Sequence, residues 1–193
     1  MVGEACRQLA EWQSRPETAQ LHLSLNLSAR ELTHPDVVAN VLGCVRESGV
    51  DPHYLTIEVT ESTAMADGDS GFRALRELSH EGIRVAIDDF GTGYSSMSYL
   101  RRLPVDIVKI DQSFVRGVAS GSTESILVHS IVDLAETLNI GVIAEGVEEE
   151  AQAEALRALR CQTGQGYLWS RPVPPDQIAD LVRSFNAPVP YPA

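Results

Sequence analysis

Two adjacent carboxylates, Asp88 and Asp89, follow the apolar run Val85–Ile87 and precede a loop that contains Gly91 and Gly93. Neighbouring acids at the end of a strand repel each other unless a cation or a basic group compensates them. A divalent metal would compensate them, and the glycine-rich loop would then be a mobile cover for the site. A solvated turn that carries both acids explains this stretch equally well, so the rest of the chain must decide.

Polar residues also stand at or near the ends of the other predicted strands. In chain order, the set is Asn26, Glu58, Asp88 with Asp89, Lys109, Glu145 and Gln165. Carboxylates with an amide form an oxygen-ligand set, which suits Mg²⁺ or Mn²⁺ better than zinc. A lysine among them is able to orient a water or to offset phosphate charge. Polar residues at six successive strand ends favour a metal site over unrelated solvated residues.

Alternating apolar and polar residues predict the strands that position this set. They cover Leu21–Leu27, Leu55–Thr60, Val85–Ile87, Val105–Ile110, Gly141–Glu145 and a weak, glycine-broken Gln162–Gly166. Helical periodicity covers Glu4–Gln13, Thr33–Gly49, Ser70–His80, Thr123–Leu138, Val147–Leu159, Pro174–Phe185 and a short turn at Ser96–Arg102. Strands that alternate with helices indicate parallel βα units. One apolar and one polar face on each strand fits a barrel better than an open, doubly wound sheet.

Bulk properties exclude several classes of protein. A net charge of −12 over 193 residues argues against a DNA- or RNA-binding surface, although a divalent metal would still admit a nucleotide. The three cysteines are far apart and form no CxxC, which argues against a disulfide framework and favours a reducing compartment. No apolar run approaches ~18 residues, so we expect a cytoplasmic protein whose segment makes no membrane contact. We expect one domain over residues 1–185 and a loose, proline-rich tail over 186–193.

Six motifs, in this order and at this spacing, resemble the EAL-domain family of bacterial cyclic di-GMP phosphodiesterases. They are NLSAR from Asn26, EVTES from Glu58, DDFGTGYSS from Asp88, LRRLPVDIVKIDQSFV from Leu100, AEGVE from Ala144 and QGYLWSRPVP from Gln165. The resemblance runs from about Ala5 to Pro174. It implies a (β/α)₈ TIM-type barrel with a two-metal Mg²⁺ or Mn²⁺ site that opens one phosphodiester bond of cyclic di-GMP and yields linear pGpG.

The resemblance also implies a role for each matching residue. Asn26, Glu58 and Asp88 would hold the first metal, with Asp88 bridging to a second metal held by Asp89. Glu145 would ligate a metal or accept the proton of the attacking water, and Lys109 would position that water. Gln165 and Asp111 would touch the substrate or a metal, while Glu61 and Glu148 would anchor the glycine-rich loop.

The chain departs from the family at the motif that names it. The family's Glu-Ala-Leu ends an early barrel strand and supplies a metal ligand, whereas Glu154-Ala155-Leu156 here falls on a predicted helix and is a coincidence. A full barrel has about 250 residues, so two strands are expected to be missing at the N-terminus, leaving about six βα units. We therefore expect impaired activity; the alternative is an inactive cyclic di-GMP-binding or protein-interaction module.

An incomplete barrel exposes two strand edges, which are prone to association. We expect the chain to form a homodimer through these edges or to cover them with its own terminal segments. Members of this family are often tethered to an upstream sensor or GGDEF domain, and no such domain is visible in the 193 residues.

Overall fold

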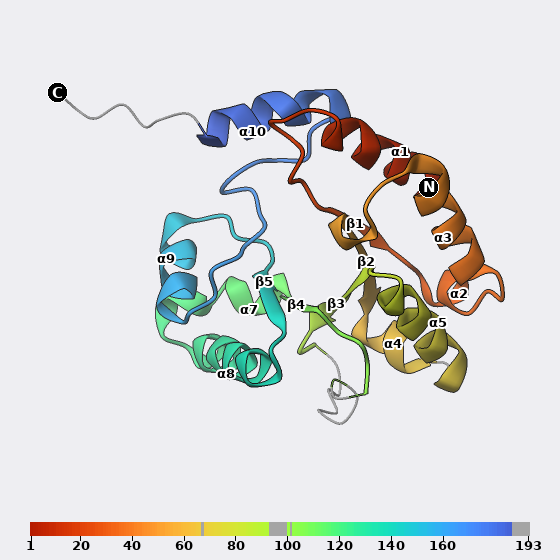
Figure 1. The fold of residues 1–193 in the computed structure, drawn as a ribbon. Helices are drawn as coiled ribbons and strands as arrows, with labels where there is room; N and C mark the ends of the chain where they lie inside the picture. The colour runs from red at the N-terminus through yellow and green to blue at the C-terminus, as the bar shows by residue number, and fades with distance from the viewer. Residues whose placement is uncertain (67, 93–99, 101, 187–193) are drawn as a thin grey trace.

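Five parallel strands form one curved sheet in chain order in the computed structural model, which describes residues 1–66, 68–92, 100 and 102–186 (Figure 1). The strands are β1 (Leu23–Asn26), β2 (Leu55–Thr60), β3 (Arg84–Phe90), β4 (Ile107–Ile110) and β5 (Gly141–Ala144). Each strand pairs with the next one along the chain. A doubly wound sheet would reverse its strand order at a switch point. The order here is that of an incomplete (β/α) barrel, as predicted.

The helices lie around the outside of the sheet (Figure 1). They are α1 (Val2–Gln13), α2 (Ala29–Leu32), α3 (Val37–Ser48), α4 (Glu61–Ala66), α5 (Gly68–His80), α7 (Gln112–Val115), α8 (Thr123–Leu138), α9 (Glu150–Ala158) and α10 (Ile178–Asn186), with 3-10 turns η1 (Pro52–Tyr54), η2 (Val118–Ser120) and η3 (Pro175–Gln177). Across the described ranges, no helix combines the length and the apolar character needed to cross a bilayer.

Three helix predictions need correction. The helix predicted from Pro174 begins as the 3-10 turn η3 and becomes α-helical only at Ile178. The helix predicted from Val147 begins only at Glu150, because Glu149 is its N-cap and forms a capping box with Gln152. The helix predicted from Thr33 begins at Val37, after the separate short helix α2, which Ser28 and Glu31 cap in the same way. The helical turn predicted over Ser96–Arg102 falls mostly outside the described residues, as does the tail after Asn186.

The sixth predicted strand, Gln162–Gly166, is not a strand. It is reduced to a single parallel bridge between Ala144 and Gly164, with the Ala144 amide donating to the Thr163 carbonyl at 3.0 Å. A Cβ on Gly166 would lie 2.0 Å from the Val147 carbonyl oxygen, so the chain there packs directly against the loop that follows β5, where no strand is available for pairing. The sheet therefore has five strands, and this segment extends it by one bridge.

The outer face of the sheet is the main core of the molecule. Leu55, Ile57 and Val59 of β2 are fully buried, and Val85 and Ile87 of β3 join them in the same cluster. Each such side chain contributes roughly 1.5–3 kcal/mol when it leaves water. This packing fixes the strands, and with them the polar residues on the opposite, inner face.

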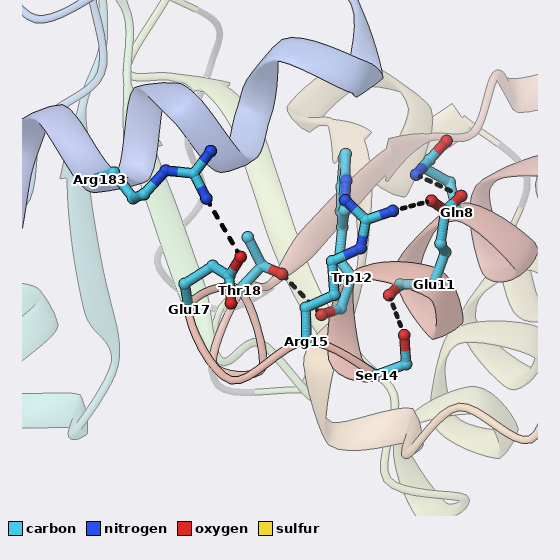
Figure 2. A network of polar contacts seen from close by, with 8 residues as sticks. All are labelled: Gln8, Glu11, Trp12, Ser14, Arg15, Glu17, Thr18 and Arg183. Carbon is cyan, nitrogen blue, oxygen red and sulfur yellow. Dashed lines mark hydrogen bonds and ion pairs between the residues drawn. The ribbon is translucent and has the colours of Figure 1, made fainter.

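The C-terminal helix α10 lies beside α1, although the two are far apart in sequence (Figure 1). Arg183 of α10 pairs with Glu17, in the turn after α1, at 3.3 Å (Figure 2). In the same turn the fully buried Thr18 donates its hydroxyl hydrogen to the Trp12 carbonyl at 2.7 Å. The last helix of the described chain is thus in contact with the turn that follows the first.

Candidate active site

A bulge at the end of β3 turns both neighbouring carboxylates toward the same site. The register between β3 and β4 shifts between Ile87 and Phe90, and Asp89 has a φ of 53°. In a regular strand Asp88 and Asp89 would point to opposite faces. Instead, carboxylate oxygens of Asp88, Asp89 and Glu145 all lie within 4.8 Å of one another. Left-handed backbone at a non-glycine residue is costly and is typical of functional sites.

Lys109 lies among three of the carboxylates. Its Nζ is 2.8 Å from Glu58 Oε2, 3.0 Å from Asp88 Oδ1 and 2.6 Å from Glu145 Oε1. Burial lowers the pKa of Lys109, but the hydrogen bonds to Glu145 and Glu58 and the charges of those groups outweigh it and raise the pKa above its ordinary value. The ammonium therefore stays charged and joins the ends of β2, β3 and β4 to Glu145.

The three clustered carboxylates still have excess negative charge. Burial raises the pKa of Glu145, and Asp88 and Glu58 add to the effect against the opposing influence of Lys109. Burial and the charges of Asp88 and Asp111 likewise raise the pKa of Asp89. Asp88 Oδ1 is buried and, although close to Lys109, accepts no hydrogen bond from the part of the chain that is described. An oxygen-only set with these properties fits Mg²⁺ or Mn²⁺.

The other two predicted ligands lie next to this cluster. Asn26 and Glu58 are paired across β1 and β2, and Asn26 Nδ2 donates to Glu58 Oε2 at 3.4 Å. Glu58 is 5% exposed and contacts Lys109, so the ammonium separates it from the group formed by Asp88, Asp89 and Glu145. The structure thus brings all five predicted ligands to one end of the sheet, in two subgroups that Lys109 connects.

A pocket of about 290 Å³ opens beside the carboxylates. Its lining is Asp89, Asp111, Gln112, Glu145, Gly146, Glu148, Gln165, Gly166 and Tyr167. The predicted residues Asp111, Glu148 and Gln165 all face this space together with Asp89. The sequence reasoning missed Gln112 and Tyr167. Each stands in a motif that carries the resemblance: Tyr167 lies two residues after Gln165, and Gln112 directly follows Asp111.

Gly146 explains how Gln112 reaches the pocket wall. Its φ is +66°, and a Cβ there would lie 2.5 Å from the Cβ of Gln112. Only glycine combines this backbone conformation with so close an approach. The loop after β5 therefore packs tightly against the start of α7, next to Glu145.

Glu61 contacts the beginning of the glycine-rich loop. Its Oε2 accepts a hydrogen bond from the Gly91 amide at 3.4 Å, and the residue is 6% exposed. Gly91 has a φ of +97° and lies against Phe114. Residues 93–99 of the loop are outside the described part of the chain, so its role as a cover stays a prediction.

Comparison with known proteins shows to which family the chain belongs. A profile of the EAL domain matches residues 1–172. The chain belongs to the EAL-domain family. This EAL chain is 43% identical, over 178 residues, to the bifunctional diguanylate cyclase/cyclic di-GMP phosphodiesterase MucR of Pseudomonas aeruginosa; the match covers 92% of the chain and 26% of that protein. The chain thus spans less than a third of the length of the curated relatives that it matches.

Solved EAL structures share the fold of this chain. The MucR phosphodiesterase in complex with c-di-GMP superposes with a TM-score of 0.86 at 44% identity, covering 92% of the EAL chain and 71% of the other. Klebsiella pneumoniae BlrP1, solved as a manganese/cyclic di-GMP complex, superposes with a TM-score of 0.80 at 33% identity, covering 88% and 42%.

Proposed function

We propose that this EAL chain binds cyclic di-GMP in the pocket beside Asp89 and hydrolyses one of its phosphodiester bonds to give linear pGpG, with Mg²⁺ or Mn²⁺ as cofactor. The observation that carries the proposal is the group of Asp88, Asp89 and Glu145, whose oxygens lie within 4.8 Å at the edge of this pocket. A relative of the same fold, solved with manganese and cyclic di-GMP, supports the choice of ligand and metal.

In this proposal the residues on the inner face of the sheet have separate roles. Asn26, Glu58, Asp88, Asp89 and Glu145 hold the metals, which when bound activate water and neutralise charge on the phosphodiester. Lys109 orients the attacking water through its ammonium group, and Glu145 takes up the proton on its carboxylate. Glu145 supports this role by its position, since it lines the pocket and its Oε1 lies 2.6 Å from Lys109 Nζ.

The remaining predicted residues bind rather than react. Asp111 and Gln165 contact the substrate from the pocket wall. Glu61 holds the glycine-rich loop at Gly91, and Glu148 assists it from the pocket wall.

A second candidate is a module that binds cyclic di-GMP without cleaving it. It is favoured by the position of Glu154-Ala155-Leu156, which lies in the outer helix α9 rather than at a strand end. The polypeptide of residues 1–193, tested by itself, would then lack one ligand that the family motif provides. We accordingly propose that cleavage by this polypeptide is slow relative to binding.

One experiment separates these functions. The polypeptide is incubated with cyclic di-GMP and Mn²⁺ while pGpG is followed by chromatography, and binding is measured by calorimetry in Ca²⁺. Turnover that Glu145→Gln abolishes supports the enzyme, and binding without turnover supports the module. If the polypeptide shows no binding and no turnover, both proposed functions are wrong.

We further propose a cytoplasmic protein in which residues 1–185 form one domain. The predicted tail lies outside the described residues except for Asn186, which is the last residue of α10. A homodimer and an attached sensor or GGDEF domain belong to the same proposal. Light scattering at several concentrations tests the dimer, since a concentration-independent monomer mass would contradict it.

A further inference from the structure

Tyr167 is a large aromatic residue held in a fixed place on the wall of the acidic pocket. It is 52% exposed. The residues on both sides of it are tied to Val147: Gly166 lies against the Val147 backbone too closely for any side chain, and the Leu168 amide donates to the Val147 carbonyl at 3.0 Å. An exposed ring on so constrained a backbone loses little conformational entropy when a ligand covers it.

The ring has one side already occupied. The guanidinium carbon of Arg171 lies 4.5 Å from the Tyr167 ring centroid, in the range of a cation–π contact. Tyr167 lines the pocket and is 52% exposed, whereas Arg171 is not among the residues that line it. The pocket side of the ring is left for a ligand.

The rest of the pocket is poorly suited to a flat, apolar group. Four of its lining residues are carboxylic acids, namely Asp89, Asp111, Glu145 and Glu148. Such residues hold cations or accept hydrogen bonds, but they offer no face on which a nucleobase stacks. Aromatic side chains provide such a face, and stacking on one contributes about 1–3 kcal/mol per base.

We propose that Tyr167 stacks against one purine base of the bound dinucleotide, an inference that rests on the proposed function of the pocket. Tyr167 would thereby hold the nucleotide by its base while the carboxylate cluster and its metals engage the phosphodiester. Tyr167 is a binding residue and takes no part in proton transfer or metal ligation. The energy of stacking corresponds to a loss of roughly 5- to 150-fold in affinity when the ring is removed.

The test measures cyclic di-GMP binding in Ca²⁺ by calorimetry for wild type, Tyr167→Ala and Tyr167→Phe. Tyr167→Ala is expected to weaken binding about fivefold or more, and Tyr167→Phe, which keeps the ring, to stay within twofold of wild type. The matched control is Phe185→Ala: Phe185 is 55% exposed on α10 and does not line this pocket, so no change is expected. Mn²⁺ binding without nucleotide should be the same in all four proteins.

The outcomes distinguish a failure of the stacking role of Tyr167 from a failure of the proposed function. If wild type binds cyclic di-GMP and Tyr167→Ala binds within twofold of it, the stacking role is wrong and the proposed function stands. If wild type does not bind the dinucleotide at all, the proposed function and the stacking role fall together. A loss of Mn²⁺ binding in Tyr167→Ala would show that the substitution disturbs the carboxylates, and would also overturn the assignment.

Discussion

Lys109 is the residue on which the inner face of the sheet depends when no metal is bound. Its ammonium contacts Glu58, Asp88 and Glu145, and the side chain is only 5% exposed. We predict that Lys109→Met lowers the free energy of unfolding in EDTA by about 3–5 kcal/mol, because it leaves buried carboxylates without a cation. Urea denaturation measures the loss, and saturating Mn²⁺ should recover much of it.

The control for this prediction is Arg15→Met, which breaks an ion pair to Glu11 whose side chains are 46% and 55% exposed. Exposed pairs contribute at most about 1 kcal/mol, so this variant should be near wild type with and without metal. Equal losses in the two variants would contradict the role of Lys109.

Asp89 and Asp111 should respond to pH in opposite directions. Burial and Asp88 raise the pKa of Asp89, so its charge opposes folding above its ordinary pKa. We predict that Asp89→Asn stabilises the metal-free protein at pH 7 and that the gain disappears near pH 3.5, where the unfolded chain also carries the proton. Thermal unfolding in EDTA at both pH values measures this, and a gain that persists at pH 3.5 would point to relief of backbone strain instead.

Asp111 provides the contrast within the same pocket. Burial raises its pKa, but hydrogen bonds from the Ser113 hydroxyl and amide outweigh this and lower the pKa, as expected for the N-cap of α7. Asp111→Ala should cost about 1 kcal/mol at pH 7. Because the folded pKa is depressed, that stability is present above the unfolded pKa and is lost as pH falls through the folded pKa.

At the scale of elements, the segment from Gln162 to Gly166 depends on glycine rather than on strand pairing. A Cβ at Gly166 would lie 2.0 Å from the Val147 oxygen and 2.4 Å from its nitrogen. We predict that Gly166→Ala lowers the free energy of unfolding by at least about 1–3 kcal/mol, because backbone must move to admit the methyl group. Chemical denaturation measures the change.

The matched control is Gly43→Ala, in the interior of α3, where a Cβ would meet nothing within 4 Å. Alanine has the higher helix propensity, so this variant should gain up to about 1 kcal/mol. The change in the free energy of unfolding should thus have opposite signs for Gly166→Ala and Gly43→Ala. Changes of the same sign would contradict the close packing at Gly166.

The regular elements were predictable and the irregular ones were not. The alternation of apolar and polar residues predicted β2 at its observed bounds, and the 3.6-residue repeat of apolar residues predicted α8. Both patterns arise because each element packs one apolar face against the core. The short helix α7 lacks such a face and is started locally by the Asp111 cap. The bulge that brings Asp89 beside Asp88 also escaped prediction: parity along a strand assigns adjacent residues to opposite faces, and only the register with β4 reveals the shift.

Across the whole molecule, α10 contacts the turn after α1 through the exposed ion pair between Arg183 and Glu17, and α10 also has a buried residue, Ala179. Arg183 is 57% exposed, whereas Ala179 is 7% exposed. We predict that Ala179→Asp, which buries a charge, raises the rate of amide exchange in residues 178–186 at least about tenfold while β2 stays protected. Hydrogen exchange by mass spectrometry measures both regions.

Arg183→Ala is the comparison for that variant. Loss of an exposed pair costs less than about 1 kcal/mol, so exchange in α10 should change little. If Arg183→Ala opened α10 as much as Ala179→Asp, the ion pair shown in Figure 2 rather than the buried contact would hold the helix.

The pairing of each strand with its immediate successor has a consequence for synthesis on the ribosome. No strand from β1 to β5 has to wait for a partner made much later, so every strand can dock as soon as the following βα unit emerges. Until then, the most recently made strand presents an unpaired edge. Once Ile110 has left the exit tunnel, β1 to β4 can pair and Lys109 can lie beside Glu58 and Asp88 before Glu145 emerges.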